Sequence, residues 1–67
     1  MAITLKAARV NKGLTQKEAA KLIGISVYSL INYERGKSFP SVPTIKKVEE
    51  VYGVAYADII FLPSDTI

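Results

Sequence analysis

The stretch QKEAAKLIGISVYSLINYER, residues 16–35, decides the fold of this chain. It predicts two short helices joined by a tight turn, because Ala20 is small enough to lie under a crossing helix and Gly24 tolerates the positive φ that the turn needs. The apolar residues that would fill the angle between the two helices are Ala19, Ile23, Ile25, Leu30 and Tyr33. These features indicate a helix-turn-helix, whose second helix presents its outer face to the major groove of DNA.

The residues in and around this stretch carry a resemblance to a known family. Its motifs are GLTQ at residues 13–16, the small pair Ala19-Ala20, the pair Ile23-Gly24, a cap at Ser26 and ERGK at residues 34–37. From about residue 5 to residue 61, the chain resembles the Cro/phage-repressor type of helix-turn-helix domain found in XRE-like transcriptional regulators. The resemblance implies an all-α, lambda-repressor-like fold of five helices and a DNA-binding function.

The composition limits what the chain can do. Its 67 residues make one small domain, with the helix-turn-helix at residues 16–35 and a C-terminal tail at residues 62–67. Cysteine and histidine are both absent, so disulfides and thiolate metal sites are excluded and the commonest general base is missing. We therefore expect no enzyme activity, no metal and no cofactor.

Positive charge is concentrated in the half of the chain that contains the helix-turn-helix. Seven of the nine Lys and Arg residues lie at or before Lys37, where only Glu18 and Glu34 oppose them, and the net charge is +3. This distribution favours attraction to a phosphate backbone, although a solvated Lys-rich surface would have the same charge. The sequence has no signal-peptide pattern and no run of membrane-spanning length, so we expect a soluble, cytoplasmic protein with no membrane partner.

Caps and breakers predict the positions of the other helices. We expect helices at about residues 4–12, 15–24, 26–35, 41–53 and 56–61. Thr15 and Glu18 have the spacing of a capping box, in which each side chain binds the backbone N–H of the other residue. Ser41 is the expected cap of the fourth helix, with Pro43 tolerated in its first turn. The sequence has no strand-like alternation, so the predicted fold is all-α.

The resemblance also implies which residues contact DNA. The family reads bases from the positions of Val27, Tyr28 and Asn32. The Asn32 amide can pair with the N6 and N7 edge of adenine. Val27 and Tyr28 can contact a thymine methyl group, and the Tyr28 hydroxyl can also donate to a base or a phosphate. The expected phosphate contacts are Arg9, Gln16, Ser26, Ser29, Arg35 and Lys37.

Two of these residues are expected to have a second role. In matching relatives, an Arg at the position of Arg9 forms an ion pair with a Glu at the position of Glu34, which ties the first helix to the end of the third. The alternative is two unrelated surface charges. Gln16, besides contacting a phosphate, is expected to steady the recognition helix from its end.

The recognition helix departs from the usual family pattern at Val27, Tyr28 and Ile31, where most relatives have Gln, Arg, Ser or Thr. We expect Val27 and Ile31 to point away from the core, because Leu30 and Tyr33 already occupy the inner face. An apolar outer face leaves a second function open, in which the domain is an antirepressor that binds another regulator. The first hypothesis remains a sequence-specific DNA-binding regulator, whether repressor or Cro-like.

A homodimer is expected, because one domain of this size buries too little surface for tight specific binding to an operator. If the chain is complete, the dimer must form through the helical domain itself. The predicted interface is the apolar C-terminal end, with Ile59, Phe61 and Leu62. The alternative is that Ile60 and Phe61 cap the core of a monomer.

Overall fold

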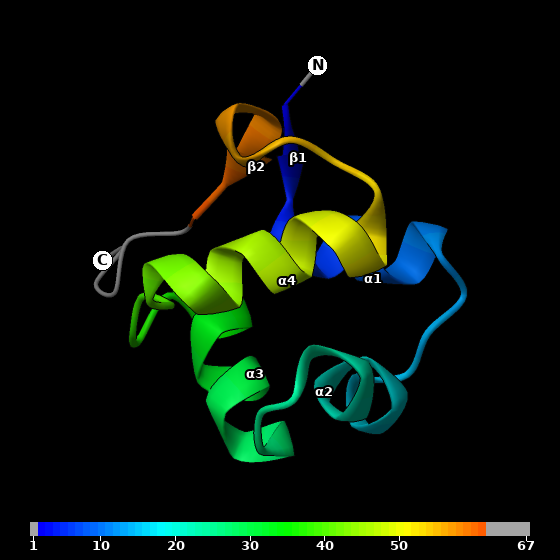
Figure 1. The fold of residues 1–67 in the computed structure, drawn as a ribbon, viewed down its shortest axis with the longest axis vertical. Coiled ribbons are helices and arrows are strands. Elements are labelled where there is room, and N and C mark those ends of the chain that lie inside the picture. Colours follow the sequence, from blue (N-terminus) through cyan, green and yellow to red (C-terminus); the bar gives the residue numbers. More distant parts are fainter. Residues whose placement is uncertain (1, 62–67) are drawn as a thin grey trace.

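The computed structural model describes residues 2–61 and contains four α-helices, one 3₁₀-helix and a pair of short strands (Figure 1). In chain order these elements are β1 (Ile3–Thr4), α1 (Leu5–Asn11), α2 (Gln16–Ile23), α3 (Val27–Arg35), α4 (Val42–Tyr52), η1 (Tyr56–Asp58) and β2 (Ile59–Ile60). In Figure 1, α4 crosses the middle of the molecule, with α2 and α3 below it and the strands above it. The mostly helical architecture predicted from the sequence is confirmed.

The turn between α2 and α3 has the predicted conformation. α2 begins with a complete capping box: Thr15 Oγ1 accepts from Glu18 N at 3.0 Å, and Glu18 Oε1 accepts from Thr15 N at 2.9 Å. α2 ends at Gly24, whose φ of 89° and ψ of 30° place it in the left-handed region. Among the described residues, no heavy atom beyond Gly24 and its two chain neighbours lies within 4 Å of the position that a Cβ would take there. Glycine is therefore required by the backbone conformation and not by lack of space.

The core is formed by side chains of all four α-helices and of β2. Its fully or almost fully buried residues are Leu5, Ala8, Ala19, Ala20, Ile23, Leu30, Val48, Tyr52 and Ile59. Ala19 and Leu30 have no exposed surface, and Ala20 is 3% exposed. Ile25 and Tyr33 are partly buried and pack against this core. The apolar residues predicted to fill the angle between the two helices therefore do so.

The fifth helix is the part of the predicted fold that needs correction. Residues 56–58 form only a short 3₁₀-helix, and the chain then continues as β2, which pairs in parallel with β1 through Ile3↔Ile59 and Thr4↔Ile60. Ile59 is 8% exposed and Ile60 is 43% exposed, which is the alternation of a strand. α1 begins directly after β1, at Leu5, because Thr4 is its N-cap and the Thr4 hydroxyl accepts from Ala7 N at 3.1 Å.

The start of α4 also differs in detail from the prediction. Ser41 is the N-cap and Pro43 lies in the first turn, as expected, but the Ser41 side chain does not bind the helix backbone. Its hydroxyl is hydrogen-bonded to Thr44 Oγ1 at 3.1 Å instead.

No helix within residues 2–61 is both long enough and apolar enough to cross a membrane.

Candidate nucleic-acid interface

α3 has one face in the core and one face in solvent. Leu30 is fully buried and Glu34 is 8% exposed, so these two residues fix the inner face of the helix. Tyr28, Asn32 and Arg35 are exposed, and their spacing of four and three residues places them along one outer line. Tyr28 is 75% exposed. The helix therefore offers solvent an aromatic ring, an amide and a guanidinium in a row.

Val27 does not lie on this outer line. It is partly buried and packs against the hydrophobic core, and Ile31 is partly buried as well. The expectation that both side chains point away from the core is therefore wrong for Val27 and too simple for Ile31. Val27, the first residue of α3, thus lies against the core. The outer face of α3 is consequently more polar than the sequence suggested.

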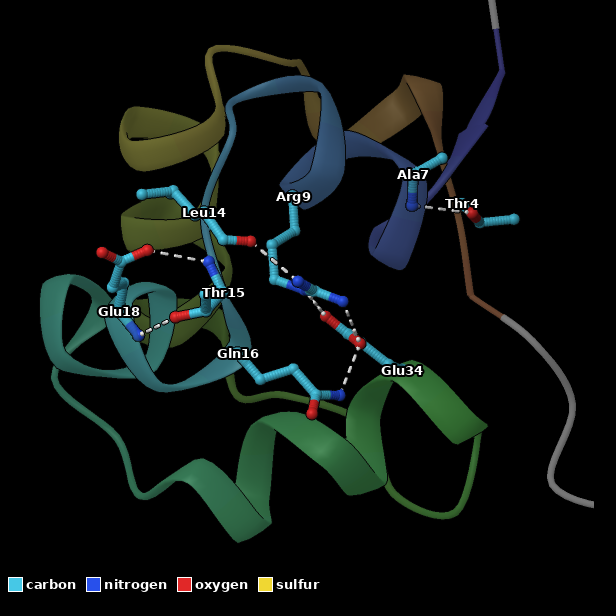
Figure 2. Close-up of polar contacts among 8 residues, drawn as sticks. All are labelled: Thr4, Ala7, Arg9, Leu14, Thr15, Gln16, Glu18 and Glu34. Atoms are coloured by element: carbon cyan, nitrogen blue, oxygen red, sulfur yellow. Dashed lines mark hydrogen bonds and ion pairs between the residues drawn. The ribbon is translucent and has the colours of Figure 1, made fainter.

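A buried polar network joins α1 to the last turn of α3 (Figure 2). Arg9 Nε lies 2.7 Å from Glu34 Oε2, and Arg9 Nη2 donates to Glu34 Oε1 at 3.4 Å. Arg9 Nη1 donates to the carbonyl oxygen of Leu14 at 2.8 Å. The ion pair expected from the resemblance is thus present, and both residues are 8% exposed. These contacts use three of the five N–H groups of Arg9, so a phosphate contact through the remaining N–H groups stays a prediction.

Gln16 extends this network to the first residue of α2. Its side-chain Nε2 donates to Glu34 Oε1 at 3.0 Å (Figure 2). This hydrogen bond ties α2 to the end of α3, which is how Gln16 steadies the recognition helix. Sequence reasoning assigned Gln16 that role without its partner, because only the crossing of the helices brings residues 16 and 34 together.

Tyr52 of α4 lies on the inner side of the same network. Its side chain is 2% exposed, and within residues 2–61 its hydroxyl has no hydrogen-bond partner. Burial raises the pKa of Tyr52 to about 12, and the charge of Glu34 adds to the rise while that of Arg9 opposes it. The hydroxyl is therefore a neutral, desolvated group in the core.

The other predicted phosphate contacts surround the two ends of α3. Ser26 is its N-cap: its Oγ accepts from Ser29 N at 3.1 Å and donates to Ser29 Oγ at 3.1 Å. The hydroxyl proton of Ser26 is thus already donated to Ser29, whereas the hydroxyl of Ser29 can still donate to a group outside the helix. At the other end, Arg35 and Lys37 are exposed on either side of Gly36, where α3 ends.

No group of residues that could hold a metal ion occurs in the part of the chain that the structure describes.

A second exposed surface, the aromatic patch, is formed by Phe39, Tyr56 and Phe61. The ring of Phe61 lies 4.7 Å from that of Phe39 and 5.7 Å from that of Tyr56. Next to it is a hollow of about 500 Å³, whose lining residues are Phe39, Pro40, Ser41, Val42, Ile45, Lys46, Glu49 and Tyr56. The neighbouring apolar side chains are also exposed, Val42 at 66% and Ile60 at 43%.

The aromatic patch changes the predicted dimer interface. Ile59 cannot belong to an interface, because it is buried in the core of its own chain and pairs with Ile3. Phe61 is partly buried and remains available at the edge of the patch, and Leu62 lies outside the described residues. Phe39 and Val42 were missed, because they precede and begin α4 in a segment that the sequence shows only as a loop and a cap.

Comparisons with known proteins agree with this geometry. The model of a helix-turn-helix family matches residues 5–59. The chain is 35% identical over 52 residues to the cryptic phage CTXphi transcriptional repressor RstR of Vibrio cholerae, and 43% identical over 51 residues to the HTH-type transcriptional regulator ImmR of Bacillus subtilis. These matches cover 78% and 76% of the chain but only 47% and 40% of the two relatives, so the chain spans less than half of their length.

A third relative has a similar length. This is an uncharacterized HTH-type transcriptional regulator of Methanocaldococcus jannaschii, which is 36% identical over 61 residues. The match covers 91% of the chain and 92% of that relative. All three relatives are named as transcriptional regulators or repressors. The chain belongs to the helix-turn-helix family of the Cro/phage-repressor type.

Proposed function

We propose that this protein is a sequence-specific DNA-binding transcriptional regulator that inserts α3 into the major groove of an operator. The observation that supports this most directly is the outer line of α3, where Tyr28, Asn32 and Arg35 are exposed while Leu30 and Glu34 hold the opposite face. A helix anchored in this way can present side chains to base edges without moving relative to its domain. Such a regulator acts in the cytoplasm, with the DNA, and has no catalytic role.

The residues around α3 divide into readers of bases and binders of phosphates. Asn32 reads adenine through its amide, and Tyr28 contacts a thymine methyl group or donates its hydroxyl. Val27 contributes only the edge of its side chain that the core leaves free. Phosphate contacts come from Gln16 and Ser29 on one side and from Arg35 and Lys37 on the other, and they fix the register of the domain on the duplex.

The protein acts as a homodimer on a two-fold symmetric operator, and the aromatic patch is the surface that a second copy covers. Large apolar residues that are exposed are typical of an interface, and Phe39 is 57% exposed and Tyr56 46% exposed. The adjoining hollow also contains Lys46 and Glu49, one residue of each charge. A surface with one charge of each sign can pair with itself across a two-fold axis, Lys46 of one copy facing Glu49 of the other.

The test compares a base-reading residue with a phosphate-binding residue. The operator is first selected from random duplexes or taken from the DNA upstream of the gene. Asn32→Ala should then weaken operator binding by about 1–3 kcal/mol and relax the preference at one position of each half-site. Lys37→Ala should weaken binding to operator and random DNA alike and lower the salt slope by about one. Unchanged operator preference in Asn32→Ala contradicts direct readout by Asn32.

A second candidate function is favoured by Tyr28, a residue that is 75% exposed on the outer face of α3. An aromatic side chain of this exposure suits a protein partner as well as DNA. The domain would then be an antirepressor that binds another regulator through α3. Specific retardation of operator DNA by the purified protein supports the first function. No retardation, together with co-purification of a repressor that Tyr28→Ala abolishes, supports the second.

A further inference from the structure

The hydrogen bond between Gln16 and Glu34 fixes which end of the Gln16 amide faces the domain. Gln16 Nε2 lies 3.0 Å from Glu34 Oε1. A carboxylate paired with a guanidinium only accepts hydrogen bonds, so it selects the nitrogen of the amide and turns the oxygen away. Figure 2 shows this arrangement, with the Gln16 nitrogen toward Glu34 and the Gln16 oxygen on the other side. The orientation of a partly exposed side chain is thus set by a buried one.

Arg9 holds the Glu34 carboxylate through two contacts. The carboxylate receives Arg9 Nε at 2.7 Å and Arg9 Nη2 at 3.4 Å, while Arg9 Nη1 is anchored to the Leu14 carbonyl at 2.8 Å. The side chain of Glu34 is only 3% exposed. A two-point contact between guanidinium and carboxylate restricts rotation of both groups. The acceptor that Gln16 meets is therefore fixed in place before any ligand arrives.

We propose that Glu34 is a positioning residue for DNA binding, and that the two N–H groups of the Gln16 amide bridge Glu34 and a phosphate oxygen. This inference rests on the proposed function, since it requires that Gln16 contacts the DNA backbone. A phosphate oxygen, like a carboxylate, only accepts hydrogen bonds. A free glutamine would present its oxygen to the phosphate in one of its two amide orientations. Glu34 excludes that orientation and leaves one N–H for the phosphate.

The arrangement also explains why a buried carboxylate is tolerable close to DNA. Arg9 balances the charge of Glu34, so the pair adds no net charge near the backbone. It still leaves Glu34 Oε1 as a strong acceptor for Gln16. A neutral residue in place of Glu34 would remove the repulsion from phosphate but would no longer select the nitrogen of the amide. The ion pair is therefore expected to affect DNA affinity through Gln16 and not through its own charge.

A double-mutant cycle on DNA affinity tests this inference. The variants are Gln16→Met, which keeps the length of the side chain without its N–H groups, Glu34→Gln, and the two combined. The probe is a random-sequence duplex, with affinity measured by fluorescence anisotropy. Gln16→Met should weaken binding by about tenfold in the wild-type protein, as for a hydrogen bond to a charged group. In the Glu34→Gln background the same change should weaken it by less than about twofold.

Lys37→Met is the matched control, because Lys37 is exposed beyond the end of α3 and is not part of the network. Its effect on affinity should be the same with Glu34 or with Gln at that position. Equal effects of Gln16→Met in both backgrounds overturn the positioning role of Glu34 while the proposed function stands. If the wild-type protein binds no duplex at all, the proposed function itself fails, and the two failures are thus distinguishable.

A second measurement needs only the wild-type protein, in case Glu34→Gln does not fold. Gln16 is the sole glutamine of the chain, so its side-chain NH₂ group gives a single, assignable pair of signals by NMR. Held by Glu34, this group should relax as a rigid unit, with an order parameter near the ~0.85 of ordered backbone. Addition of duplex DNA should shift mainly one of its two protons. An amide as mobile as a free side chain overturns the inference.

Discussion

Replacing Ala20 by leucine tests the crossing of α2 and α3, on which the direction of the recognition helix depends. Ala20 is 3% exposed and belongs to the same core as Leu30, which has no exposed surface. Its carbonyl oxygen also accepts from Gly24 N at 2.8 Å and from Ile25 N at 3.0 Å. The backbone at Ala20 is thus anchored to the turn, and α2 cannot move outward to make room without straining that turn.

The expected size of the effect follows from packing. Leucine adds three carbon atoms at a site of which only 3% is exposed, and overpacking of this kind costs about 1–3 kcal/mol. Unfolding entropy of roughly 2.1 cal/mol/K per residue gives roughly 0.14 kcal/mol/K for 67 residues. The midpoint of thermal unfolding should therefore fall by about 7–20 °C. In a domain this small, such a loss is a large part of the total stability.

Thermal unfolding followed by circular dichroism measures this effect directly. Ala57→Leu is the matched control, because it makes the same chemical change at an exposed position in η1 and should leave the midpoint nearly unchanged. Operator affinity at a temperature where both variants are folded should fall only for Ala20→Leu, because α3 is displaced. If the Ala20→Leu midpoint equals that of the wild type, the two helices do not cross at Ala20 and our account of α3 is wrong.

Three further substitutions, at Tyr52, Gly24 and Glu18, each test one feature of the fold. Tyr52→Phe removes a buried hydroxyl that has no hydrogen-bond partner among residues 2–61, so it should raise the free energy of unfolding by up to about 1 kcal/mol. A lower free energy of unfolding in urea would mean that the hydroxyl is hydrogen-bonded. Gly24→Ala should cost about 1–2 kcal/mol from its left-handed backbone alone, since no atom obstructs the new Cβ; an unchanged urea midpoint would contradict this.

The hydrogen bond from Thr15 N, with a smaller effect of the Thr15 hydroxyl, lowers the pKa of Glu18 below its ordinary value of 4.5. Its stabilisation is therefore complete well above pH 4.5 and is lost as the pH falls through the lowered pKa of the folded state. Glu18→Gln should make stability less dependent on pH in that acid range, and an unchanged pH profile would refute the capping role.

Local signals predicted the helices well, because each helix end is determined by a few neighbouring residues. Thr15, Ser26 and Gly24 were identified as caps and have those roles in the structure. The strand pair could not be found in the same way. Ile3 and Ile59 are far apart in the sequence, and strands of two residues are too short to show alternation. Residues 59–61 were therefore assigned to a helix because they continue an apolar run.

The candidate site was predictable as a set of positions but not as a set of contacts. The motif identified Gln16, Arg9 and Glu34 as functional positions, yet their division between surface and interior depends on how α1 meets α3. Arg9 can be buried because the Leu14 carbonyl and Glu34 accept from three of its N–H groups. Val27 packs against the core, which depends on how α3 is placed in the fold. Such placement is a tertiary property that no local pattern contains.

The pairing of β1 with β2 has a consequence for the order in which the domain is completed. β1 precedes β2 along the chain, so Ile3 has no strand partner until residue 59 has been synthesised. A nascent chain that ends at Gly53 already contains α1, α2, α3 and α4, but Ile3 and Thr4 then lack the strand that pairs with them. Of the residues that the structure describes, the last strand thus closes over the first, and the recognition helix lies in the chain between them.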